Sequence, residues 1–176
     1  MIERDLERIG HPIRNHIGYD KFTPAAIATL FGAFSVHLII GSQYAWGNMA
    51  PYIVGYYRDL GIDTNMSEFY LVLPLIVITS TVFFPIGMCL TDLVNSRYVI
   101  LLGGIIVVMA VFYASRSVSQ AMFFVLYAVG FGIGKGFLYP APLVAGWSHL
   151  SGRKGFVSGI IVSGLGIGAL VFGIIA

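Results

Sequence analysis

Long stretches without charge are the main constraint on how this chain folds. Four stretches hold no Asp, Glu, Lys or Arg, and a fifth holds only Lys135. Overall 10% of the residues are charged, against roughly 25% in an average soluble domain. Because a bilayer core needs about 20 apolar residues per helix, the pattern predicts an all-α integral membrane protein. We expect five transmembrane helices, at about residues 25–54, 68–91, 97–115, 119–145 and 155–175.

The polar start of the chain is expected to lie outside the bilayer. Residues 1–23 form an N-terminal segment, and residues 24–176 form the expected five-helix transmembrane domain. Ile2, Leu6 and Ile9 share one helical face, which indicates a short amphipathic helix. That helix would lie on the membrane surface or contact solvent or a partner.

The first uncharged stretch is longer than one bilayer crossing. Its 36 residues, 22–57, would extend about 54 Å as a straight helix, well beyond a roughly 30 Å hydrocarbon core. Two spans would not fit in it. We therefore expect one tilted helix that is disturbed near Pro51.

The positions of lysine and arginine predict the orientation of the chain. Basic residues concentrate in cytoplasmic segments, which places the N-terminus on the cytoplasmic side or on an equivalent side such as a matrix. No targeting signal identifies which membrane holds the protein. With this orientation seven basic residues lie inside (Arg4, Arg8, Arg14, Lys21, Arg97, Arg153 and Lys154) and two lie outside (Arg58 and Arg116).

Several classes of function are not expected from this sequence. The net charge is only +2 and there is no basic tract, so a nucleic-acid partner is not expected. One cysteine and no suitably spaced histidine pair indicate no metal site. No nucleophile and base form a catalytic constellation, so we expect neither an enzyme nor a cofactor.

Lys135 is the charge that the fourth predicted helix must accommodate. Placing a lysine at the bilayer centre costs about 2.5–3.5 kcal/mol, so its side chain is expected to face the protein interior. It binds an anion in a cavity, extends to the membrane interface, or pairs internally, for example with a carbonyl freed by Pro140. In the first helix, His37, Gln43 and Tyr44 are candidates for the opposite wall of that cavity or for hydrogen bonds between helices.

Glycines at four-residue spacing predict close packing of the last two helices. Such small-xxx-small pairs let helix backbones approach each other in lipid, where there is no hydrophobic drive between helices. The expected packing positions are Gly130, Gly132, Gly134, Gly155, Gly159, Gly164 and Gly168.

A short polar turn joins the second and third predicted helices. Asp92, Asn95 and Arg97 form D-x-x-N-x-R, which resembles the signature loop of the major facilitator superfamily. Asn95 would replace the glycine of that loop, because Asn tolerates the left-handed region. Asp92 would pair with a neighbouring helix terminus or with Arg97 and form a gating latch. The other interpretation is an ordinary short turn.

A longer resemblance covers the membrane part of the chain. The segment GFGIGKGFLYPAPLVAGWSHLSGRKGFVSGIIVSGLGIG, residues 130–168, resembles the fourth and fifth helices of the monocarboxylate and oxalate–formate branch of that superfamily. GSQYAWGNMAPY resembles its first helix. The resemblance implies a secondary antiporter-like transporter of small carboxylates and adds Tyr139 to the candidate substrate residues. Lys135 departs from the pattern, because the basic substrate residues of that branch usually lie on other helices.

The resemblance also implies what the chain would assemble with. Transporters of this superfamily have two six-helix halves, and the resemblance covers the first five helices only. We therefore expect a transporter-like protein that is incomplete as given and does not transport alone. The alternative is a structural or accessory subunit of a larger membrane complex, such as a mitochondrial inner-membrane assembly. The expected partners are the lipid bilayer, other membrane polypeptides and, for a transporter, a small organic anion.

Overall fold

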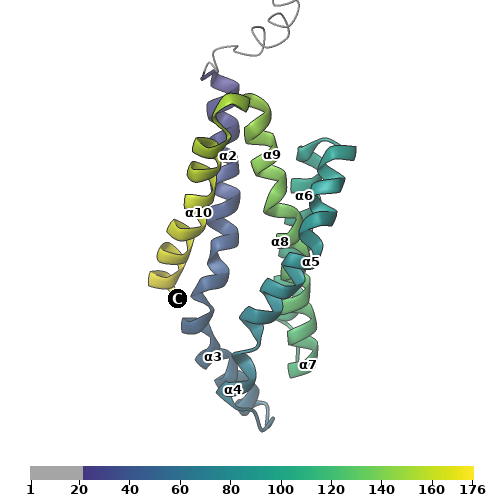
Figure 1. The fold of residues 1–176 in the computed structure, drawn as a ribbon. Helices are drawn as coiled ribbons and strands as arrows, with labels where there is room; N and C mark the ends of the chain where they lie inside the picture. The colour runs from purple at the N-terminus through teal and green to yellow at the C-terminus, as the bar shows by residue number, and fades with distance from the viewer. Residues whose placement is uncertain (1–21) are drawn as a thin grey trace, which may run out of the picture.

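The computed structural model describes residues 22–176, and within that range every regular element is helical (Figure 1). Five helical spans are long and apolar enough to cross a membrane: Pro24–Asp59, Met66–Leu93, Ser96–Ala114, Gln120–His149 and Ser151–Ile175. The predicted all-α membrane class with five spans is thus confirmed. The amphipathic helix predicted near residues 1–9 lies outside the described residues, as does nearly all of the polar segment 1–23.

Most of the spans are built from more than one helical element. The first span comprises α2 (Pro24–Ile40), the 3₁₀ turn η1 (Gly41–Ala45) and α3 (Trp46–Asp59). The second comprises α4 (Met66–Phe69) and α5 (Val72–Leu93), and the third is α6 (Ser96–Ala114). The fourth comprises α7 (Gln120–Phe123), the π-helical η2 (Phe124–Gly130), α8 (Phe131–Leu138) and α9 (Pro140–His149). The fifth comprises η3 (Ser151–Arg153) and α10 (Lys154–Ile175).

The first span is irregular at η1 and not at Pro51, which corrects the expected position. Pro51 lies inside the continuous helix α3. The hydrogen bond that Pro51 removes is the one to Gly47, which lies in α3 and not in η1. Tertiary packing acts at η1 itself, because a Cβ atom at Gly41 would lie 2.5 Å from the carbonyl oxygen of Leu165. Close contact with α10 thus coincides with the tightened turn.

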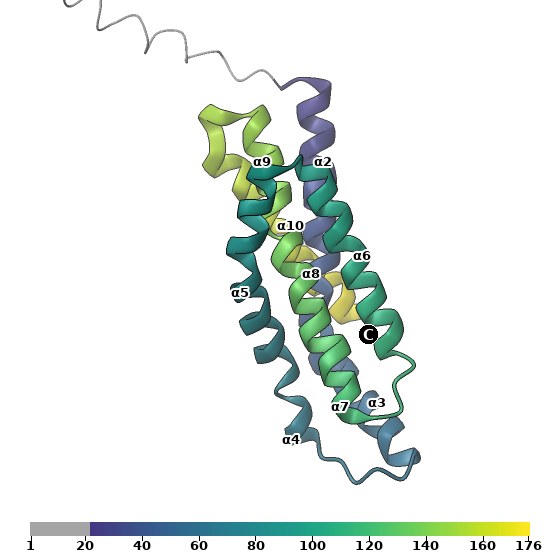
Figure 2. The ribbon, with the colours of Figure 1, turned by 90° about the vertical axis from the view of Figure 1, so that its right-hand side faces the viewer.

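The fourth span lies at the centre of the bundle. In Figures 1 and 2, α8 runs beside α5 and α6, and Figure 1 shows α9 between α2 and α6, both of which it contacts. In the most apolar 18-residue segment of this span, 50% of the residues are buried. In the corresponding segment of the fifth span only 17% are buried. A helix in this position must contact neighbours on several faces, which requires small residues where backbones approach.

Two glycine pairs in α8 and in the turn before it pack against two different neighbouring helices. Cβ atoms at Gly132 and Gly136 would lie 2.7 Å and 2.5 Å from the Cβ atoms of Thr79 and Phe83 in α5. Gly130 and Gly134 meet α6 in the same way, at the side chains of Ala110 and Val107. The backbone of α8 is therefore wedged between α5 and α6.

The fifth span contacts the first through only some of the expected glycines. Gly164 and Gly168 of α10 lie against the backbone of α2, and a Cβ atom at Gly164 would lie 2.5 Å from the carbonyl oxygen of Phe34. A Cβ atom at Gly155 or Gly159 would meet no atom within 4 Å. The expected close packing at Gly155 and Gly159 is therefore absent from the described chain, because both lie on the exposed face of α10 while Val157 and Ile161 pack inward.

An aromatic cluster joins three spans at the end of the bundle where α3, α4 and α7 meet. Trp46 stacks on Phe69 and Phe123, and its Nε1 donates to the carbonyl oxygen of Phe69 at 3.1 Å. The hydroxyl of Tyr57 lies 2.8 Å from Ser117 Oγ. Tyr57, Phe69 and Trp46 are almost fully buried, so aromatic side chains pack between the spans at this end of the bundle.

The arrangement predicts opposite labelling of two loops. In a Cys89→Ser background, we expect Asp63→Cys and Ser151→Cys to react with a membrane-impermeant maleimide from opposite sides, because both are exposed and three spans separate them. The positive-inside rule predicts that Ser151 faces the cytoplasm or its equivalent. Labelling of both positions from one side would contradict the five-span topology.

Candidate functional site

Lys135 of α8 points toward the irregular turn of the first span. Its side chain is 8% exposed, and its Nζ donates to Gln43 Oε1 at 3.1 Å. The same ammonium lies 5.9 Å from the ring centroid of Tyr44. The two glycine faces of α8 pack against α5 and α6. The side chain of Lys135 therefore lies on a third face of the helix, which is directed at η1. This places a buried cation between the first and fourth spans.

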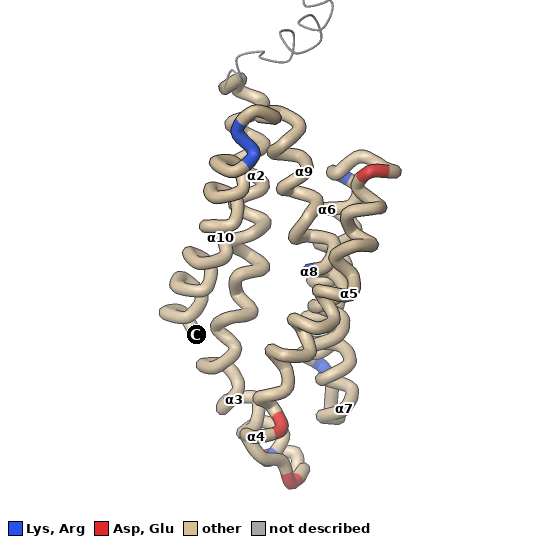
Figure 3. The backbone as a smooth tube through the Cα atoms, in the orientation of Figure 1, with Lys and Arg blue, Asp and Glu red and all other residues tan. Residues whose placement is uncertain are grey.

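No carboxylate compensates this charge within residues 22–176. The acids described there, Asp59, Asp63, Glu68 and Asp92, lie at the ends of the spans, and Figure 3 shows the charged residues other than Lys135 concentrated at the two ends. The lysine contacts the neutral amide of Gln43, and the expected alternative, a carbonyl freed by Pro140, is not among its contacts in the described chain. A buried cation without a counter-ion attracts an anion.

His37 lies behind the lysine in the same part of the bundle. It is fully buried, its Nδ1 lies 3.1 Å from the carbonyl oxygen of Ala33, and its ring centroid is 5.1 Å from that of Tyr139. A carbonyl only accepts, so Nδ1 carries hydrogen and a neutral ring offers Nε2 as an acceptor. His37 Nε2 and Gln43 Nε2 are buried without a hydrogen-bond partner among the described residues. Native structures rarely leave such atoms unpaired without a reason.

A cavity of about 410 Å³ opens beside this cluster. Lys135, Tyr44 and Tyr139 form part of its wall, with His37 and Gln43 packed behind them. The structure therefore brings together all five residues that the sequence singled out as candidate substrate ligands. Five further lining residues come from α5 and were not among the candidate substrate residues: Val77, Ser80, Thr81, Phe84 and Pro85. The sequence signals for them were the proline and a run of three hydroxyl residues, Thr79, Ser80 and Thr81.

The polar turn between α5 and α6 differs from the expected geometry. Asn95 has φ −63° and ψ 136°, so its backbone is extended and not left-handed. It acts as the N-cap of α6, and its side-chain oxygen accepts from the backbone N–H of Arg97 at 3.1 Å. Capping satisfies the turn without a positive φ, which corrects that expectation. Asp92 and Arg97 form no ion pair with each other in the described residues, and a gating role for this turn stays a prediction.

Comparison with known proteins identifies one relevant similarity. The chain is similar to a protein named apicoplast pyruvate carrier 1 from Toxoplasma gondii, with 29% identity over 181 aligned residues that cover 83% of this chain and 33% of the relative. The chain therefore spans about a third of the length of the relative it matches. No family model matches the chain, and no solved structure matches it.

These comparisons correct the family assignment made from the sequence. The chain was expected to belong to the monocarboxylate and oxalate–formate branch of the major facilitator superfamily. No family model matches the chain, that superfamily's included, and the relative found is a protein named as a pyruvate carrier. The assignment is therefore withdrawn, together with the antiporter class and the oxalate and formate substrates that depended on it.

Proposed function

We propose that this chain forms part of a membrane carrier for a small carboxylate such as pyruvate. The observation that carries the proposal is the buried ammonium of Lys135, which has no carboxylate partner among the described residues and lines a cavity of about 410 Å³. The similarity to a protein named as a pyruvate carrier supports the same class of solute. A carrier needs no bond-making chemistry, which agrees with the neutral lining of the cavity around a single cation.

The proposed recognition uses the ammonium of Lys135. A carboxylate at the cavity wall would accept a charge-assisted hydrogen bond from Lys135 Nζ, which is stronger than a neutral hydrogen bond. Gln43 lies behind the wall, and its Oε1 accepts a hydrogen bond from the same ammonium. Its amide would therefore hold the ammonium in place for the carboxylate.

We further propose that another membrane polypeptide, or another part of a longer chain, covers the site during transport. The cavity wall includes residues from three spans only, and Tyr44, Val77 and Phe84 in it are 53%, 46% and 36% exposed. A carrier must shield a bound anion from lipid, because a charge in hydrocarbon is unfavourable. The transport experiments below therefore use the complete carrier assembly and not this chain alone.

A charged substitution at Gln43 tests the proposal directly. Gln43→Glu would place a carboxylate at the position of Oε1, 3.1 Å from Lys135 Nζ, and form an internal ion pair that competes with the substrate. We expect saturable uptake of labelled pyruvate into proteoliposomes to fall by about tenfold or more, while the amount of folded protein is unchanged.

The apolar change Gln43→Met, which keeps a similar side-chain length, is the matched control. It removes the hydrogen bond without adding a competing anion, so we expect a smaller loss of uptake than in Gln43→Glu. Equal uptake by Gln43→Glu and the unmodified carrier would rule out a substrate carboxylate at Lys135. A complete carrier that takes up no small carboxylate at all would reject the proposed function.

A further inference from the structure

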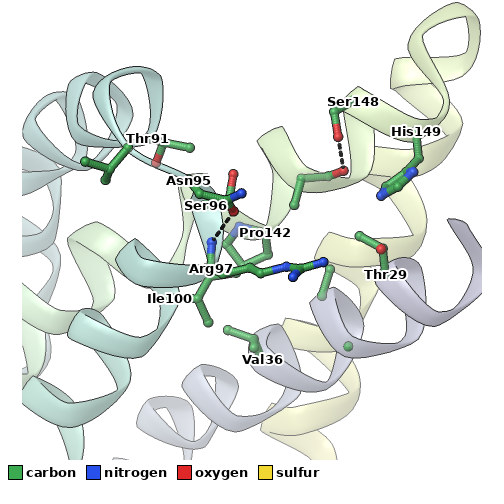
Figure 4. Close-up of a pocket in the computed structure, with 14 residues that line it drawn as sticks. Thr29, Val36, Thr91, Asn95, Ser96, Arg97, Ile100, Pro142, Ser148 and His149 are labelled. Carbon is green, nitrogen blue, oxygen red and sulfur yellow. Dashed lines mark hydrogen bonds between the residues drawn. The ribbon is translucent and has the colours of Figure 1, made fainter. Parts of the chain in front are cut away.

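A second cavity lies at the end of the bundle where α6 begins and α9 ends. Its volume is about 520 Å³, and residues of α2, α6 and α9 line it (Figure 4). The residues that matter here are Thr29 and Val36 from α2, Arg97 and Ile100 from α6, and Ser148 and His149 from α9. Thr91 of α5 also lines it, so the cavity joins the first four spans.

The lining changes from polar to apolar along the cavity. Figure 4 shows the side chain of Arg97 extending across the cavity toward Thr29 of α2, with His149 beyond it, while Val36 and Ile100 lie together at a deeper level. The backbone N–H of Arg97 is bonded to Asn95, but its guanidinium has no hydrogen bond or ion pair within residues 22–176. The cavity thus combines an unpaired cation at its mouth with an apolar wall.

This cavity is separate from the one beside Lys135. The two share no lining residue, and the cavity of Lys135 is lined mainly by α5 whereas this one is lined mainly by α2, α6 and α9. The two cavities are therefore separate sites.

The charges at this end favour an anion. Its described charged residues are three basic side chains, Arg97, Arg153 and Lys154, and one acid, Asp92, which does not line the cavity. The opposite end has two basic residues, Arg58 and Arg116, against three acids, Asp59, Asp63 and Glu68. Figure 3 shows the basic α9–α10 turn at the same end as the start of α6. The positive end of the α6 helix dipole adds to this potential.

We propose that this cavity binds the headgroup of an anionic phospholipid. The guanidinium of Arg97 matches two phosphate oxygens, and Thr29 and His149 in the same lining offer further polar groups. An acyl chain follows the apolar wall of Val36 and Ile100. The site lies at the end of the spans, at the depth of lipid headgroups, where anionic lipids attract basic residues. The proposal does not rest on the carrier function.

Lipid binding to the purified chain tests this proposal. We expect native mass spectrometry of the full chain in detergent to show bound dioleoyl phosphatidylglycerol in preference to dioleoyl phosphatidylcholine. Arg97→Gln should weaken the binding of phosphatidylglycerol by about tenfold, because a charge-assisted hydrogen bond is lost. Arg153→Gln is the matched control, since it removes the same charge at the same end from an exposed residue outside the cavity, and its lipid binding should stay within about twofold.

Two further measurements separate the possible ligands. Val36→Trp keeps every charge but fills the apolar wall, so it should also weaken phosphatidylglycerol binding if an acyl chain lies there. Inorganic phosphate and glycerol 1-phosphate, at millimolar concentration, should not displace the lipid. Displacement by either, or an unchanged affinity in both Arg97→Gln and Val36→Trp, would overturn the proposal. Equal affinity for the two lipids would do so as well.

Discussion

Replacing Lys135 with methionine should lower the kcat/KM of pyruvate uptake by the complete carrier by about 10- to 100-fold. A hydrogen bond between charged groups contributes roughly 1.5–3 kcal/mol, and the substrate would lose its cationic partner. Methionine has a similar length and is apolar, so it fills the same volume without burying a charge. Uptake of labelled pyruvate into proteoliposomes measures the effect, normalised to the folded protein.

The lysine at the start of α10 provides the matched control. Lys154→Met removes an identical side chain that is exposed at a helix end, and uptake should stay within about twofold of the unmodified carrier. Lys135→Arg keeps the charge and should retain part of the activity. Normal uptake kinetics in Lys135→Met would assign this lysine to packing with Gln43 and not to the substrate.

Replacing Gly134 with leucine should prevent most of the chain from folding in membranes. A Cβ atom at this position would lie 2.6 Å from Val107 Cγ2 and 2.8 Å from the carbonyl oxygen of Gly103. Cβ atoms in proteins do not approach other atoms so closely. The α8 helix cannot shift away from α6, because its backbone at Gly132 and Gly136 already contacts α5. Overpacking of this kind costs about 3 kcal/mol or more, a large part of the stability of a typical domain.

Fluorescence-detected size-exclusion chromatography in mild detergent measures the outcome. Gly134→Leu should lose most of the monodisperse peak. Gly155→Leu, which makes the same substitution at a position with no atom within 4 Å, should elute like the unmodified chain. Equal behaviour of the two variants would contradict the close approach of α6 and α8.

The five-span class followed from the sequence because the bilayer imposes a local requirement. About 20 consecutive residues must be apolar, so a gap between charges is enough to detect a span. The candidate residues around Lys135 were also predictable from the sequence, because a charged or polar side chain in such a gap is uncommon and needs a partner. The sequence offered no comparable signal for the residues that α5 contributes to the cavity.

Contacts between spans depended on the tertiary structure. Gln43 and Lys135 are 92 positions apart, and their contact requires the rotation of α8 fixed by its glycine faces and the tightened turn η1 beside α10. The four-residue glycine spacing is the same in Gly155/Gly159 and Gly164/Gly168, yet only the second pair meets a neighbouring backbone. The local glycine spacing indicates which helix surfaces permit close approach of another backbone. Which of them are used depends on where the neighbouring helices lie, and that is set by the packing of all five spans together.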